Sequence, residues 1–130
     1  MTAAVFGDYS VLVIEDESFT RMVLAKMLGA LGFRAVHQAQ DGTSGLSAVR
    51  DHAPDIILCD VEMQPMDGLG FLKALRGSSN ARDLSLPVVF MTNRADEGRV
   101  AEARALGAGT FLVKPATPDN LRQALAAHLG

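Results

Sequence analysis

Four short, uninterrupted apolar runs are the sequence feature that most constrains the fold of this chain. These runs are Val11–Ile14, Ile56–Cys59, Val88–Met91 and Phe111–Val113. A strand with one solvent face alternates apolar and polar residues, whereas a strand covered on both faces is continuously apolar. A fifth segment, Arg34–Ala39, is mixed in character and is typical of an edge strand. The sequence therefore predicts five strands, four of them buried.

Stretches with helical spacing separate these strands. The first can end at Gly32, and its apolar stripe consists of Phe19, Met22, Val23, Met27 and Leu31. Asp41 and Asp67 each precede a glycine and predict N-caps of helices that run to about Asp51 and Arg76. Alternating strands and helices favour a parallel sheet with helices on both faces, which is a doubly wound, three-layer α/β fold.

The last helix is predicted to start at Thr117–Pro118, which supplies an N-cap and a proline at the first helical position. With 130 residues, 48% of them hydrophobic, the chain can bury one core and is too short for two ordinary domains. We therefore expect residues 1–130 to form a single domain.

Charge and cysteine content exclude several classes of protein. The net charge of -3 and a pI near 5.5, without a basic cluster, argue against binding to nucleic acid or to an anionic membrane. The single cysteine, Cys59, lies in an apolar run and is predicted to be a small buried hydrophobe. The first residues form no export leader and no run has membrane-spanning length, so a cytoplasmic protein is expected. We expect no metal role for His37, His52 and His128, which are scattered over separate elements.

Polar residues follow the buried runs at the positions where parallel sheets bind ligands. They are Glu15–Asp16, Asp60, Thr92 and Lys114–Pro115. Three carboxylates at one sheet edge repel one another unless a cation lies among them, and Mg²⁺ prefers oxygen ligands. Lys114 adds a positive charge suited to phosphate. Acidic residues also follow parallel strands simply as helix N-caps, and Asp16 or Asp60 taken alone fits that role.

From Val11 to the last helix, the chain resembles the receiver domains of response regulators in two-component signalling systems. The motifs that carry this resemblance are Glu15–Asp16, Asp60, Met63 with Met66-Asp67-Gly68, Thr92 and Lys114–Pro115. The resemblance implies a flavodoxin-like, CheY-like fold with strand order 2-1-3-4-5. It further implies a phosphoaccepting regulator, free-standing here, that acts in chemotaxis or in a phosphorelay and is no turnover enzyme.

By this resemblance, Asp60 takes a phosphoryl group from a sensor histidine kinase or a histidine phosphotransfer protein. Asp16, Asp60 and the backbone carbonyl of Glu62 would bind Mg²⁺ or Mn²⁺ directly, and Glu15 would bind it mainly through water. Lys114 and Thr92 would contact phosphoryl oxygens. Positioning and neutralisation of charge do most of the catalysis in such transfers.

The resemblance also implies a switch in which Thr92 moves toward Asp60 and Phe111 turns inward. An ordinary core phenylalanine in the fifth strand explains Phe111 equally well. A downstream protein would read the face formed by the fourth helix, fifth strand and fifth helix. The fourth helix, within Arg94–Leu106, should be held weakly, because its only apolar anchors are Val100, Ala101, Ala103 and Leu106.

Further expectations concern the loops. The Lys114–Pro115 bond is expected to be cis. Glu62 and Arg94 should flank the path of the water that attacks the aspartyl phosphate, and we hypothesise that they pair and set its lifetime. A monomer or weak dimer is expected.

Three positions depart from the family pattern. Glu15 replaces the commoner aspartate, which lengthens the side chain but keeps its charge. Pro65 comes one place later than usual, which leaves the path of the loop open. Asn93 replaces a small residue and narrows the access to Asp60.

Rival functions are a haloacid-dehalogenase-type aspartyl phosphatase and a pseudo-receiver that binds partners without phosphorylation. The phosphatase pattern needs a second aspartate where Glu62 stands and a cap domain. Asp60, Thr92 and Lys114 argue against the pseudo-receiver. A dinucleotide-binding domain is excluded because Gly68-Leu69-Gly70 lacks the third glycine of its fingerprint.

Overall fold

A parallel five-stranded sheet forms the centre of the computed structural model, which describes residues 6–78, 80, 83, 85–92, 97–107 and 110–129. The strand order is β2-β1-β3-β4-β5, as the family resemblance implied, and every neighbouring pair is parallel. The strands are β1 Ser10–Ile14, β2 Ala35–Ala39, β3 Ile56–Asp60, β4 Val88–Thr92 and β5 Thr110–Val113.

The burial of the strands follows their apolar patterns in β1 to β4 but not in β5. Every residue of β1, β3 and β4 is buried, because these three central strands are covered on both faces. β2, predicted as an edge strand, lies at one edge and buries fully only Ala39. β5 forms the other edge and buries fully only Leu112, so the prediction that the run Phe111–Val113 is a buried strand is wrong. As the last strand in the order, β5 has a neighbouring strand on one side only and is less covered than the central strands.

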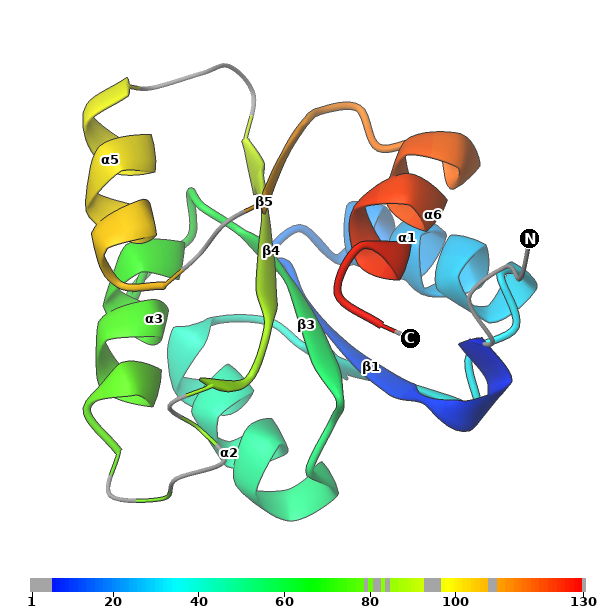
Figure 1. The fold of residues 1–130 in the computed structure, drawn as a ribbon, viewed down its shortest axis with the longest axis horizontal. Helices are drawn as coiled ribbons and strands as arrows, with labels where there is room; N and C mark the ends of the chain where they lie inside the picture. Colours follow the sequence, from blue (N-terminus) through cyan, green and yellow to red (C-terminus); the bar gives the residue numbers. More distant parts are fainter. Residues whose placement is uncertain are drawn as a thin grey trace.

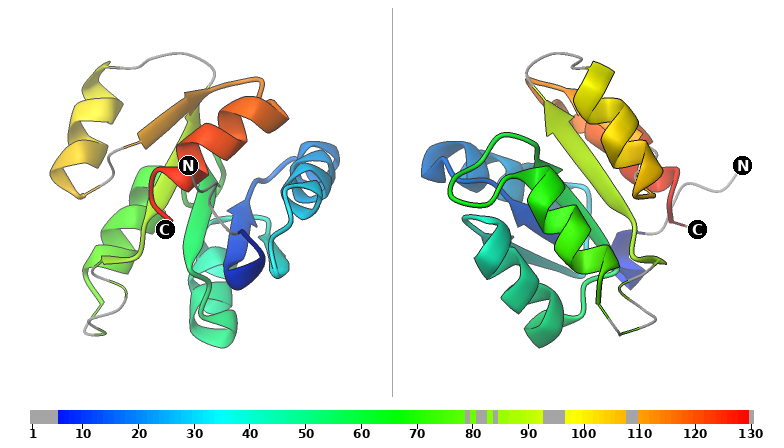
Figure 2. Two further views of the ribbon diagram at one scale, coloured as in Figure 1. Left: turned by 45° about the vertical axis from the view of Figure 1, so that its right-hand side comes forward. Right: turned by 90° about the vertical axis from the view of Figure 1, so that its left-hand side faces the viewer.

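Helices cover both faces of the sheet, as predicted (Figure 1). α1 and α6 lie on one face, and α2, α3 and α5 lie on the other (Figures 1 and 2). Successive residues of β1 serve the two layers in turn: Val11 and Val13 pack with α1 and α6, whereas Leu12 and Ile14 pack with α2 and α3. The helices are a 3-10 helix at Phe6–Asp8, α1 Ser18–Ala30, α2 Gly42–His52, α3 Gly68–Arg76, α5 Glu97–Ala105 and α6 Pro118–Ala126.

The predicted helix caps are confirmed. The side chains of Asp41, Asp67 and Thr117 accept hydrogen bonds from backbone N–H groups in the first turns of α2, α3 and α6. Gly32 follows α1 with a φ of 101°, in the region that favours glycine. Within the described residues, none of the helices is long and apolar enough to cross a membrane.

Candidate phosphoacceptor and metal site

The carboxyl ends of four strands bring the predicted polar residues to one edge of the sheet. Asp60 and Thr92 are the last residues of β3 and β4. Glu15 and Asp16 directly follow β1, and Lys114 directly follows β5. Because β3 lies between β1 and β4, Asp60 stands at the centre of the group.

Glu15, Asp16 and Asp60 form an acidic cluster that suits a hard cation. Each offers a carboxylate oxygen, and these oxygens lie within 4.8 Å of one another. Glu15 and Asp60 are only 2% and 3% exposed, whereas Asp16 is open to solvent. No other group of three or more potential metal-ligating side chains of this kind is found in the described part of the chain.

The surroundings of Glu15 disfavour its charged form. The pKa of Glu15 is raised to about 8, first by burial and then by the hydrogen bond and the negative charge of Asp60, while Lys114 opposes the shift. Its Oε2 atom is buried and has no hydrogen-bond partner among the described residues. A divalent cation would both pair this oxygen and relieve the repulsion, so the donor set fits Mg²⁺.

Lys114 supplies the positive charge at the site. Its Nζ atom lies 2.9 Å from Oδ2 of Asp60 and 3.7 Å from Oε1 of Glu15. Burial alone would lower the pKa of Lys114, but the hydrogen bond and charge of Asp60, followed by those of Glu15, raise it above its usual value. The backbone holds the residue in place, because Lys114 N–H donates to the carbonyl of Thr92 at 2.7 Å. The Lys114–Pro115 bond is cis, as expected.

The β3–α3 loop approaches the site closely because Gly68 has no side chain. A Cβ atom on Gly68 would lie 2.5 Å from the carbonyl oxygen of Asp60 and 2.8 Å from the ring of Phe90. The N–H of Gly68 donates to the carbonyl of Val61 at 2.9 Å. The Asp67-Gly68 pair therefore caps α3 and seats its first turn directly against the end of β3.

The rest of this loop has two features that the sequence did not specify. Gln64–Pro65 is a second cis bond, at the displaced proline. The side chain of Met66 lies against Gly42, where a Cβ atom would come within 2.6 Å of its Cγ and Sδ atoms. Met66 thus ties the loop to the start of α2.

Glu62 is exposed and lines a hollow of about 320 Å³, together with Asp16, Met63, Gln64 and Asp67. Its backbone N–H donates to Oδ1 of Asp60 at 3.3 Å. Arg94, its expected partner, and Asn93 lie outside the described residues. The Glu62–Arg94 pair therefore stays a prediction.

The two expected switch residues lie on neighbouring strands. Thr92 is 6% exposed at the end of β4. Phe111, on β5, is half-buried, and its ring centroid lies 5.9 Å from that of Phe90 in the core. The guanidinium of Arg104, on α5, lies 5.8 Å from the Phe111 ring. The core role of Phe111 is visible in this packing, and its role as a switch stays a prediction.

Near the sheet, one prediction is confirmed and two arrangements were missed from the sequence. Cys59 is fully buried, as predicted. His37 and His52 do lie on separate elements, but their rings stack with centroids 4.1 Å apart, so these two are not scattered. Arg21 donates from Nη1 to the carbonyl of Glu15 at 2.8 Å. A hydrogen bond from a side chain to a backbone carbonyl leaves no sequence motif. The only hint is that Arg21 lies in the first part of the helix that follows the acidic pair.

An apolar groove of about 540 Å³ lies beside Lys114. One wall is the first half of α1 and the other is the chain that follows β5. Phe19, at the start of α1, is 65% exposed here. The lining residues are Phe19, Thr20, Val23, Leu24, Met27, Met91, Lys114, Pro115 and Ala116.

Comparisons with known proteins agree with this geometry. The family model of the response regulator receiver domain matches residues 11–126. A probable chemotaxis protein CheY of Rhizobium etli is 32% identical over 120 residues, which cover 92% of each chain. The structure of the chemotaxis protein CheY4 of Vibrio cholerae has a TM-score of 0.86 and 30% identity, covering 93% of this chain and 98% of that chain.

A further similar structure shows a metal. It is the receiver domain of a sensor histidine kinase from Pseudomonas aeruginosa, with a magnesium ion coordinated in its active-site cleft. Its TM-score is 0.80 at 26% identity, and the match covers 92% of this chain and 96% of that chain. The chain is thus similar both to separate chemotaxis regulators and to a receiver domain of a kinase.

Proposed function

Because the chain belongs to the response regulator receiver domain family, we propose that it is a phosphoaccepting switch in which Asp60 carries the phosphoryl group. One observation carries this proposal: a nearly buried carboxylate lies 2.9 Å from the Lys114 ammonium and within 4.8 Å of two further carboxylates. This arrangement combines a nucleophile, a cation site and a positive charge for a phosphoryl oxygen.

In the proposed reaction, a carboxylate oxygen of Asp60 attacks the phosphorus of a phosphohistidine in a sensor histidine kinase or a histidine phosphotransfer protein. The P–N bond breaks, the electron pair returns to the imidazole, and an aspartyl phosphate forms. Lys114 and the hydroxyl of Thr92 would then bind phosphoryl oxygens.

Asp16, Asp60 and the backbone carbonyl of Glu62 would hold Mg²⁺, or Mn²⁺, directly, and Glu15 would hold it through water. Bound there, the ion would neutralise charge on the transferred group. The fit rests on the raised pKa of Glu15 and on its unpaired buried oxygen.

The groove beside Lys114 is the surface on which we place the phosphodonor. It adjoins the acceptor through Lys114, and its exposed Phe19 offers apolar area to a protein partner. A donor docked there would bring its phosphohistidine close to the carboxyl ends of β3 and β5.

The output of the switch is the face made by α5, β5 and α6, which are the fourth helix, fifth strand and fifth helix of the sequence prediction. Among the described side chains of α5, only Ala103 is fully buried. Val113 on β5 is 55% exposed. Movement of Thr92 and Phe111 would alter this face for a downstream protein.

Glu62 and Arg94 are proposed to set the lifetime of the aspartyl phosphate. If they do, Glu62→Ala and Arg94→Ala will change the rate at which phosphorylated protein decays. Decay rates equal to that of the parent would contradict this part of the proposal. The cytoplasmic location, the monomeric or weakly dimeric state and the absence of nucleic-acid binding stay predictions.

The deciding experiment uses intact mass. The protein is incubated with Mg²⁺ and acetyl phosphate, beside an Asp60→Asn variant and a sample with excess chelator. We expect a gain of one phosphoryl mass that is labile to base and is lost in both controls. The absence of any gain, also with a phosphorylated phosphotransfer protein as donor, would contradict the proposal and favour a pseudo-receiver.

A further inference from the structure

The connection between β1 and α1 carries two of the three clustered carboxylates. It is three residues long, Glu15 to Glu17, because β1 ends at Ile14 and α1 begins at Ser18. Both of its ends are hydrogen-bonded to the fold. The N–H of Glu15 donates to the carbonyl of Ala39 on β2 at 3.1 Å, which continues the sheet ladder by one bond. The carboxylate of Glu17 caps α1.

Arg21 closes this connection from the other direction. Its side chain reaches back from α1, and Nη1 donates to the carbonyl of Glu15 at 2.8 Å in a partly buried position. The N–H of Arg21 donates to the carbonyl of Glu17 at 2.9 Å. Arg21 therefore binds the carbonyl that precedes Asp16 with its side chain, and with its backbone it makes the ordinary first-turn helix bond to the carbonyl of Glu17.

The connection needs such a tie because its side chains repel one another. Glu15 is buried with an unpaired Oε2, and it lies next to the charges of Asp60 and Asp16. Movement of the short connection away from β3 would also lessen this repulsion and would separate the carboxylates. A guanidinium that holds a backbone carbonyl opposes this movement without occupying any carboxylate oxygen.

We propose that Arg21 is a positioning residue of the metal site, which holds Glu15 and Asp16 in place for the cation through its bond to the Glu15 carbonyl. This inference rests on the proposed function, because it assumes that the acidic cluster binds Mg²⁺. Mutation of a residue that orients a metal ligand without binding the metal itself commonly weakens metal affinity by roughly 10- to 100-fold. Arg21 acts on backbone rather than on a ligand atom, so we expect the lower end of this range.

The test compares Mg²⁺ binding by four proteins: the parent, Arg21→Met, Arg21→Lys and Lys26→Met. Binding is measured from the backbone amide chemical shifts during titration with MgCl₂. Arg21→Met should weaken the apparent Kd about tenfold. Arg21→Lys keeps one donor and should recover part of the loss. Lys26 is exposed on the same helix, so Lys26→Met should bind Mg²⁺ like the parent.

A second readout separates positioning from general loss of stability. In excess chelator, amide hydrogen exchange of residues 15–17 should be faster in Arg21→Met, while exchange in β3 stays as in the parent. An unchanged Kd, an equal loss in Lys26→Met, or equally accelerated exchange in β3 would overturn the role of Arg21 alone. A parent protein that shows no Mg²⁺-dependent shifts at all would instead overturn the proposed function, and this inference with it.

Discussion

Helices α1 and α6 on one face of the sheet differ from α5 on the other face in how they are held. In the layer of α1 and α6, the buried helical side chains are all leucines: Leu24, Leu28, Leu121 and Leu125. In the opposite layer, α3 is also well packed, but α5 buries only Ala103 among its described side chains. Polar contacts also join α3 to neighbouring segments there.

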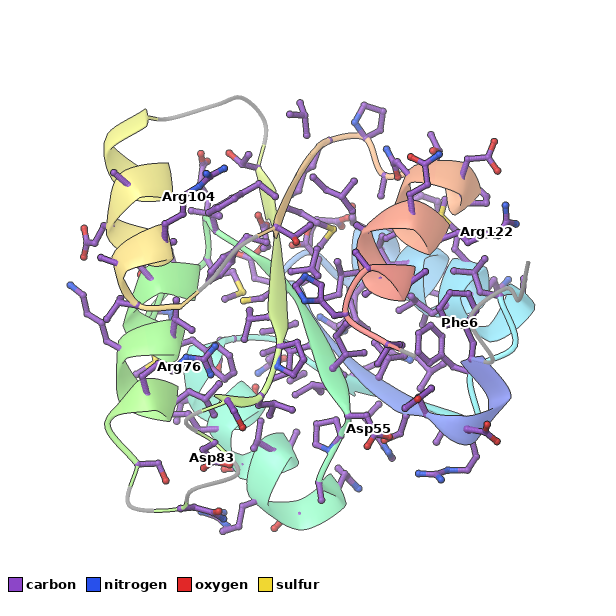
Figure 3. All side chains as sticks on the ribbon, viewed as in Figure 1. Phe6, Asp55, Arg76, Asp83, Arg104 and Arg122 are labelled. Carbon is purple, nitrogen blue, oxygen red and sulfur yellow. The ribbon has the colours of Figure 1, made fainter. Side chains whose placement is uncertain are left out.

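Arg76 is the clearest of these polar contacts. Its side chain extends from the end of α3 (Figure 3) and donates to the carbonyls of Asp83, Leu86 and Leu106 at 2.9, 2.9 and 3.0 Å. Nearby, the ammonium of Lys73 lies 2.6 Å from the carboxylate of Glu102, so that α3 and α5 are joined side by side (Figure 2). Apolar contacts respond little to a new charge, whereas hydrogen bonds and ion pairs respond strongly. α5, which belongs to the proposed output face, is therefore next to contacts that a new charge can alter.

The largest expected effect is on the apolar layer. Leu28→Ala removes a side chain that is 0% exposed, and the free energy of unfolding should fall by about 2–5 kcal/mol. Leu106→Ala is the matched change beside α5, at a half-buried position, and its effect in urea denaturation should be less than half as large. Equal losses would remove the distinction between the layers.

Removal of the Arg76 guanidinium should have the next largest effect. Arg76→Met leaves three carbonyls without this donor, and unfolding should become easier by about 1–3 kcal/mol. Hydrogen exchange should accelerate in the last turn of α5 more than in α1. Arg122→Met, at an exposed arginine, serves as the control. Uniform acceleration in both helices would contradict a specific tie to α5.

The stability of the protein should depend on pH through His37 of β2, which stacks on His52 of α2. The pKa of His37 is lowered, first by burial and then by the nearby His52. Below the usual histidine pKa of 6.5, the unfolded chain binds a proton that folded His37 resists, so stability is lost as the pH falls. His37→Gln should show a smaller decrease in urea midpoint from neutral to acidic pH than the parent does. A slope in His37→Gln equal to that of the parent would contradict this role of His37.

The smallest effect is expected for the Lys73–Glu102 pair. Both side chains are largely exposed, so solvent and salt screen their attraction. At physiological ionic strength, the urea midpoint of Lys73→Met should equal that of the control variant Lys26→Met within experimental error. A clear loss of stability that persists at high salt would mean that α5 depends on this pair far more than its exposure indicates.

Much of the fold could be predicted because its signals are local. Continuous apolar runs marked the buried strands, and Asp41, Asp67 and Thr117 marked helix starts, since a cap needs only its own first turn. The gathering of Asp60 with Lys114 followed from parallel strands that end at one edge. The strand order and the cis bond at Lys114 came from the family resemblance, because neither periodicity nor spacing determines them.

The features that escaped prediction depend on how elements meet in space. The Arg21 bond to a backbone carbonyl and the stack of His37 on His52 join elements at positions without a sequence pattern. The cis bond at Pro65 belongs to a loop whose path the displaced proline left open. Such contacts need the packed structure, since side-chain identity alone does not specify the partner.

The hydrogen bond between Lys114 N–H and the carbonyl of Thr92 has a mechanical consequence. Thr92 and Lys114, whose side chains are proposed to contact the phosphoryl group, share this backbone hydrogen bond, 2.7 Å long, at the end of the β4–β5 ladder. A force on either side chain therefore acts on the same backbone hydrogen bond. Under the proposed function, we therefore expect that a phosphoryl group bound by either side chain would move the ends of β4 and β5 together.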